Sequence, residues 1–164
     1  MQLKFFKKEM MKKVLVITMF ILALSIGAQA QSYKNAIGLR GGEPSGITFK
    51  TFINNTNALE LIAGVAYGFD NFLITGLYEF EKPTGWAPNL DWYIGFGAHL
   101  GFWNQDKADE YETAIVLGAD VVGGIEYTFD DLPLNIALDL IPSFDIIGGD
   151  WFHFKAGISF RYAF

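Results

Sequence analysis

The chain has 164 residues, of which 51% are hydrophobic and 16% aromatic, with no cysteine and a net charge of −6. This apolar and aromatic composition excludes a disordered chain, and the length suits a single domain. A chain without cysteine has no disulfides, no thiolate nucleophile and no cysteine-ligated metal or iron–sulfur site.

Residues 1–30 have the pattern of a secretory signal peptide. A short basic stretch precedes an apolar run at 14–26, and Ala28-Gln29-Ala30 resembles a small-residue cleavage site. The run is shorter than the roughly 20 apolar residues that a spanning helix needs. We therefore expect export and cleavage, whether translation starts at Met1 or at Met11. Loss of five lysines and one glutamate leaves 7 basic and 17 acidic residues, a net charge of −10, which excludes a typical nucleic-acid partner.

Beyond residue 30, apolar residues recur with a period of two, which predicts β-strands. No window of helical length carries a 3.6-residue apolar stripe. Clusters of Gly, Pro, Asn and Asp between the alternating segments predict turns. We expect eight strands, at 35–41, 46–53, 58–67, 71–80, 91–102, 115–129, 134–145 and 152–164.

The last predicted strand shows its two faces most clearly. Phe154, Ile158 and Phe160 share one face, and Lys155 and Arg161 share the other. Strands of about 9–11 residues cross a bilayer when tilted. The small residues on the polar faces suit the crowded interior of an eight-stranded barrel. We therefore expect the apolar faces to meet lipid and the ionisable side chains to point toward the barrel axis.

Aromatic residues gather near both ends of the predicted strands, which is typical of the two girdles at membrane–water interfaces. An open sheet edge in hydrocarbon would leave backbone groups unpaired, so the first and last strands are expected to pair. One expected girdle comprises Phe80, Trp92, Tyr127, Phe129, Tyr162 and Phe164, and the other comprises Tyr67, Phe72, Phe102, Trp103, Phe144 and Phe152.

The ending Phe160-Arg161-Tyr162-Ala163-Phe164 resembles the C-terminal strand signature of bacterial outer-membrane β-barrels. Residues 31–164 resemble the small eight-stranded group typified by outer-membrane proteins A and X, and 37–50 resembles the opening hairpin of small Bacteroidetes barrels. The resemblance implies an all-β, eight-stranded antiparallel up-and-down transmembrane barrel of porin-like class in a Gram-negative outer membrane. It also implies contact with outer-membrane lipid and lipopolysaccharide, and recognition of Phe160, Tyr162 and Phe164 by the barrel-assembly machinery.

If both termini of the barrel are periplasmic, the connections between strands alternate between outer loops and periplasmic turns. Outer loops are expected at 41–45, 68–71, 104–113 and 146–150, and inner turns at 54–57, 81–89 and 130–133. The acidic loop 104–113 is expected to be solvated, because its acidic spacing does not match an EF-hand. We expect a monomer without metal or cofactor.

Nearly all charged residues of the predicted strands fall on inward positions. Charges in a narrow, dry lumen must be paired or neutralised. Because eight strands leave little room for water, a network that plugs the lumen is favoured over a proton or ion path. Its expected members are Arg40, Lys50, Glu60, Glu79, Asp91, Glu126, Asp139, Lys155 and Arg161.

Simple antiparallel register predicts particular neighbours in this network. Lys50 is expected opposite Glu60, Glu60 near Glu79, and Glu79 near Asp91. Acids outnumber bases in this layer, so one carboxyl is expected to be protonated. Further expected neighbours are Glu126 with Arg161, Lys155 with Asp139, and His99 with Asp120.

Three functions remain open from the sequence. A non-enzymatic outer-membrane barrel of structural or unknown role is favoured. The second is a lipid A-modifying enzyme using His99 or His153 with Ser143 and Asp145, which is disfavoured because these side chains should point into the lumen. The third is a secreted, soluble, lipocalin-like barrel that carries a small apolar ligand.

Overall fold

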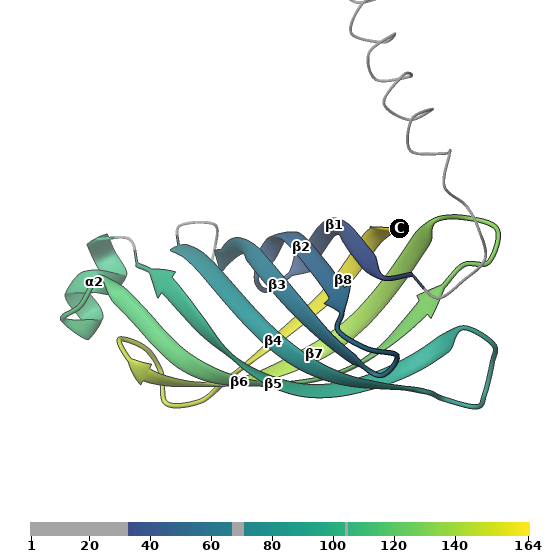
Figure 1. Cartoon of the computed structure of the whole chain (residues 1–164). Coiled ribbons are helices and arrows are strands. Elements are labelled where there is room, and N and C mark those ends of the chain that lie inside the picture. Colours follow the sequence, from purple (N-terminus) through teal and green to yellow (C-terminus); the bar gives the residue numbers. More distant parts are fainter. Residues whose placement is uncertain (1–32, 67–70, 104) are drawn as a thin grey trace, which may run out of the picture. The chain divides into compact units, whose positions relative to one another are not determined.

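The computed structural model describes residues 33–66, 71–103 and 105–164. In these residues eight antiparallel strands form a closed barrel, in which each strand pairs with its sequence neighbours and β1 pairs with β8 (Figure 1). The all-β, up-and-down, eight-stranded architecture predicted from the sequence is confirmed. The strands are β1 (Asn35–Gly42), β2 (Ser45–Phe52), β3 (Asn57–Ala66), β4 (Asn71–Pro83), β5 (Leu90–Phe102), β6 (Ile115–Thr128), β7 (Leu134–Ile147) and β8 (His153–Ala163).

Some sequence predictions concern residues that the structure does not describe, and some predicted strand bounds differ from those of the structure. The expected signal peptide, Tyr67 and most of the expected 68–71 loop lie outside the described residues. The strand boundaries differ most at β4, which ends at Pro83 rather than at residue 80. Its pairing with β5 continues to Pro83 opposite Asp91, so the turn between these strands is shorter than predicted.

The barrel closes where β1 meets β8. The backbone N–H of Asn35 donates to the carbonyl of Phe164 at 2.9 Å, and the N–H of Phe164 donates to the carbonyl of Asn35 at 2.7 Å. This closure leaves neither β1 nor β8 as an open edge. We call this end of the barrel, which holds Asn35 and Phe164, the terminal end.

A short helix, α2 (Gln105–Tyr111), follows β5 at the opposite end, which we call the helix end (Figure 1). This helix lies within the connection predicted as a loop over 104–113, and the sequence did not predict it. Ala108 and Tyr111 of α2 pack against a buried cluster that includes Trp103, and a helix of seven residues is too short to show a periodic apolar pattern. The described residues contain no helical segment with the length and hydrophobicity of a membrane-spanning helix.

The two faces of the strands differ sharply in chemistry. Large apolar side chains cover the outside: Leu39 is 68% exposed, Phe154 65% and Phe96 58%. On the same last strand, Lys155 is 1% exposed and Arg161 is fully buried. The predicted orientation of the faces is thus confirmed, with apolar groups outside and charged groups inside.

Aromatic side chains lie near both ends, in contact with one another. At the terminal end the rings of Tyr162 and Phe164 stack, with centroids 5.9 Å apart. At the helix end the rings of Phe144 and Phe152 approach to 5.0 Å. Trp103 is the exception to the predicted girdles, because it is only 9% exposed and packs inward.

Candidate functional site

The candidate site is the barrel interior, which is filled by buried charged and apolar side chains. It holds a charged cluster around Lys50 and Arg161 near the terminal end, a first apolar cluster, the Arg40–Asp139 ion pair, a second charged cluster around His99, and an apolar cluster under α2. The first apolar cluster contains Ile62, Leu77, Tyr93, Val122, Ala137 and Ile141.

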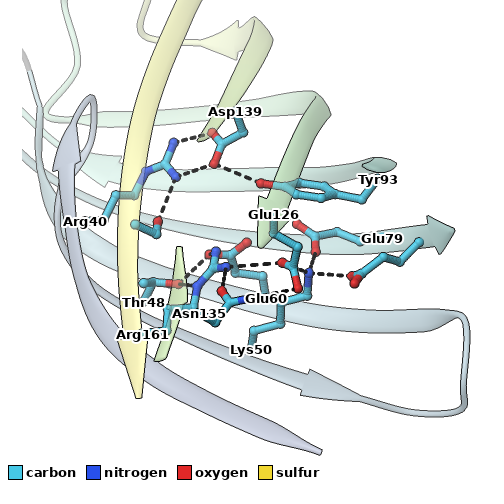
Figure 2. Close-up of polar contacts among 12 residues, drawn as sticks. Arg40, Thr48, Lys50, Glu60, Glu79, Tyr93, Glu126, Asn135, Asp139 and Arg161 are labelled. Carbon is cyan, nitrogen blue, oxygen red and sulfur yellow. Dashed lines mark hydrogen bonds and ion pairs between the residues drawn. The ribbon is translucent and has the colours of Figure 1, made fainter. Parts of the chain in front are cut away.

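Lys50 of β2 is the centre of the terminal-end cluster (Figure 2). Its ammonium nitrogen lies 3.0 Å from Glu79, 2.7 Å from Glu81 and 2.6 Å from Glu126. The same nitrogen is 4.6 Å from the ring centroid of Tyr93, a distance suited to a cation–π contact. One fully buried cation is therefore shared by three carboxyl groups.

Arg161 of β8 is the second cation of the terminal-end cluster. Its guanidinium donates to Glu60 at 2.5 Å and to the side-chain oxygen of Asn135 at 3.1 Å, and it lies 3.4 Å from Glu126 (Figure 2). Thr48 also donates its hydroxyl to Glu60. We define the terminal-end cluster as Lys50, Glu60, Glu79, Glu81, Glu126 and Arg161.

Tyr33, which precedes β1, reaches this cluster from the barrel end. Its hydroxyl donates to Oε1 of Glu126, and its ring packs edge-on against Phe52. Burial, reinforced by the charge of Glu126, raises the pKa of Tyr33 well above its usual value. The phenol therefore stays a hydrogen-bond donor at neutral pH.

Arg40 and Asp139 form a separate ion pair further along the lumen. The two guanidinium nitrogens of Arg40 donate to the two carboxylate oxygens at 2.7 and 2.5 Å. Tyr93 adds a third hydrogen bond to Asp139, at 3.1 Å (Figure 2). Bidentate pairs of this kind are among the stronger charge-assisted contacts.

The second charged cluster is built around His99 of β5. Its Nδ1 lies 2.9 Å from Asp120, and its Nε2 lies 2.9 Å from Asp145. Lys155 lies 3.1 Å from Asp120, and Ser143 donates to Asp120 at 2.5 Å. We call these five residues the histidine cluster.

The interior partners differ in part from those predicted. Lys50 lies opposite Glu60, and Glu126 contacts Arg161, as predicted.

Two predicted partners were wrong. Asp139 pairs with Arg40 and not with Lys155, which contacts Asp120 instead. The predicted turn over 81–89 would place Glu79 opposite Asp91. Because β4 continues to Pro83, Asp91 lies opposite Pro83 instead, and Glu79 lies opposite Gly95. His99 contacts Asp120 as predicted.

Of the nine residues predicted for the lumen network, Asp91 alone is not buried in an ion pair among the described residues. It is half-buried at the terminal end, opposite Glu126 in the strand register. The other eight are buried and ion-paired; they are Arg40, Lys50, Glu60, Glu79, Glu126, Asp139, Lys155 and Arg161.

Sequence reasoning missed Glu81 and Tyr33. Glu81 was assigned to a turn, although it continues the inward series of alternate residues from Glu79. Extension of the period-two pattern by one step would have found it. Tyr33 precedes the first strand and shows no such signal.

The residues considered for catalysis lie in the histidine cluster or beside it. Ser143 is opposite His153 in the register, and Nδ1 of His153 is 3.7 Å from Asp145. The Ser143 hydroxyl, however, donates to Asp120 and to the carbonyl of Ile141. Among the described residues, no group of three or more His, Asp or Glu side chains is arranged to hold a metal ion.

The C-terminal residues lie on the outer face or at the barrel rim. Phe160 is 49% exposed and Phe164 is 55% exposed, and Tyr162 is half-buried. Their role as a recognition signal for assembly stays a prediction. A comparison of the chain with protein-family models and with curated proteins finds no match in either set.

Proposed function

We propose that this protein is an integral outer-membrane β-barrel without enzymatic activity, and that its lumen is closed to ions. The observation that carries the proposal is the inverted distribution of its side chains. Exposed apolar residues occur on all eight strands, and the buried interior holds Arg, Lys, Glu, Asp and His. A water-soluble barrel needs the opposite distribution, because the outward apolar faces would be in contact with water.

The backbone pairing and the strand lengths also favour a membrane environment. In hydrocarbon every backbone N–H and C=O must be paired within the protein, and a closed barrel meets this demand. β4, β5, β6 and β7 have 13 or 14 residues. Tilted strands of about 9–11 residues are sufficient to cross the hydrocarbon core, so these four strands reach beyond it. The partners implied are outer-membrane lipid and lipopolysaccharide, with the barrel-assembly machinery acting during biogenesis on Phe160, Tyr162 and Phe164.

The filled interior supports a closed lumen. An ion entering from the terminal end meets Lys50 and Arg161, both fully buried, and the interior beyond them is occupied by the apolar Ile62, Leu77 and Ile141 and by the Arg40–Asp139 ion pair. An ion passing these packed side chains would lose its hydration at a large energetic cost. We therefore propose a structural role, or another role that does not involve transport through the barrel.

The two alternative functions have less support. A lipid-modifying hydrolase needs its serine in contact with the histidine base, whereas Ser143 donates to Asp120. A carrier of a small apolar ligand needs a roomy apolar cavity, whereas the interior is packed with charged side chains. We therefore retain the non-enzymatic membrane barrel.

Three measurements test the proposal. Cell fractionation should place the mature protein in the outer membrane, and it should migrate faster on gels when unheated than when boiled. The purified barrel in planar bilayers should show no steady conductance. Recovery of the folded protein in the soluble fraction would refute membrane residence, and stable channel currents would refute the closed lumen.

Enzymatic activity is tested separately. Expression of the wild type, of His99→Ala or of His153→Ala should leave the acylation pattern of lipid A identical to that of cells without the protein. An acylation change that is present with wild type and absent with either variant would replace the non-enzymatic proposal.

A further inference from the structure

The terminal-end cluster has more carboxyl groups than cations. Its four carboxyl groups belong to Glu60, Glu79, Glu81 and Glu126, and its two cations are Lys50 and Arg161; all six residues are buried. Full ionisation would leave two uncompensated negative charges inside the barrel. Uncompensated buried charge is so costly that such groups take up protons instead.

The contacts divide the four carboxyl groups into two pairs. Glu60 and Glu79 are diagonal neighbours on the inward faces of β3 and β4, and Glu81 and Glu126 both lie within 2.7 Å of the Lys50 ammonium nitrogen. Ionised carboxylates are acceptors only, so two of them cannot hydrogen-bond each other. A carboxyl–carboxyl hydrogen bond requires one proton in each pair.

The hydrogen bonds to each carboxyl group indicate which member holds the proton. Glu60 accepts hydrogen bonds from Arg161 and Thr48, whereas neither oxygen of the fully buried Glu79 accepts a hydrogen bond from a described donor. Oε2 of Glu79 lies 3.0 Å from Lys50, and its Oε1 has no such contact. Glu79 is therefore the less stabilised anion of its pair.

The second pair shows the same asymmetry. Glu126 accepts hydrogen bonds from Tyr33, Lys50, Asn135 and Arg161. The structure gives Glu81 one such donor, Lys50, at 2.7 Å. Glu126 is therefore the better stabilised anion, and Glu81 is the member that takes the proton.

We propose that the terminal-end cluster is a binding site for two protons, one held by Glu79 and shared with Glu60, the other held by Glu81 and shared with Glu126. With both protons bound, two carboxylates balance the two cations and the cluster is neutral. The protons come from solvent as the barrel folds. This inference goes beyond the proposed function and holds whether or not the barrel lies in a membrane.

The other titratable groups around the site do not alter this balance. Arg40 and Asp139 neutralise each other in a separate pair. Tyr33 and Tyr93 are uncharged hydrogen-bond donors, to Glu126 and Asp139 respectively. Asp91 is half-buried at the barrel end, where solvent screens its charge. Removal of both protons in alkaline medium would leave two negative charges inside the barrel.

Proton uptake on folding measures the occupancy of the site directly. The chain is diluted from urea into detergent micelles at about pH 7.5 in weak buffer, where glutamates of the unfolded chain are ionised. Compared with wild type, Glu79→Gln and Glu81→Gln should each take up about one proton fewer, and the double variant about two fewer. Asp131→Asn, which changes an exposed carboxylate in the β6–β7 turn, should take up as many as wild type.

Both glutamine variants are expected to fold, because the amide N–H can replace the proton as donor to Glu60 or Glu126. Equal uptake by the wild type and the double variant would overturn the proposal. Infrared spectroscopy of the folded wild type provides a test that needs no variant. A carbonyl band of protonated carboxylic acid should be present at neutral pH and disappear on alkaline titration; its absence at neutral pH would also overturn the proposal.

Discussion

Arg40 of β1 reaches across β8 to bind Asp139 of β7, with both guanidinium–carboxylate contacts at 2.7 Å or less. β1 and β7 are not neighbours in the sheet, since β8 lies between them. Gly157 of β8 makes the crossing possible, because a Cβ at this position would overlap the Arg40 guanidinium. One glycine thus creates the space for an ion pair between strands that share no backbone hydrogen bond.

Loss of Arg40 should be costly, because it would leave Asp139 buried without its cation. We expect Arg40→Met to lower the free energy of unfolding by about 3–5 kcal/mol, as measured by urea unfolding in lipid vesicles. The double variant Arg40→Met, Asp139→Leu should recover most of this loss, because no isolated charge remains. Lys34→Met, at an exposed lysine near the terminal end, serves as the control and should change stability little. A single variant as stable as the control would contradict the prediction.

The closure between β1 and β8 should be sensitive to one methyl group. A Cβ at Gly38 would overlap the carbonyl oxygen of Phe160, a backbone atom that can move only with its strand. Gly38→Ala should therefore cost about 1–3 kcal/mol of unfolding free energy. Gly76→Ala is the matched control, because a Cβ there has no atom within 4 Å. Equal stability of the two variants would show that the closure tolerates the added group.

If the outer apolar face contacts lipid, a charged residue introduced there should lower the stability of the barrel. Leu138 lies on the outer face of β7 and is 56% exposed, and Leu132 is 54% exposed in the β6–β7 turn. In lipid vesicles, Leu138→Lys should lower stability by up to about 2–4 kcal/mol, and Leu132→Lys should have little effect. The two leucines are equally exposed, so a difference between them reports on environment rather than on burial. Similar small effects at both positions would argue against a lipid-facing β7.

Alkaline stability should depend on Tyr33. Its phenol has a pKa raised by burial and by Glu126, so the folded state holds this proton more tightly than the unfolded state. The stabilisation is fully present below the ordinary tyrosine value of about 10 and is lost as pH rises through the higher folded-state value. Over that alkaline range, the urea midpoint of Tyr33→Phe should fall less steeply than that of wild type. Parallel pH profiles would show that Tyr33 does not contribute.

The sequence by itself determined the strands and their faces. A side-chain period of two is local to each strand, so Phe154 and Lys155 could be assigned to opposite faces without knowledge of any partner. The number of strands and the inward position of eight network residues follow from the same pattern. The sequence did not predict α2, because a helix this short has too few residues to show a periodic apolar pattern. Its packing depends on contacts of Ala108 and Tyr111 with the barrel.

Only the tertiary structure decided which charges meet. Strand tilt and stagger in a closed barrel bring together residues from strands that are not adjacent, as with Lys50 of β2 beside Glu79 of β4 and Glu126 of β6. Hairpin register constrains only adjacent strands, which is why Asp139 was predicted to pair with Lys155 rather than Arg40. Glu81 entered the cluster because β4 extends three residues beyond its predicted end. The charge balance of the interior is therefore a property of the closed barrel, because no single hairpin contains all of the groups that must neutralise one another.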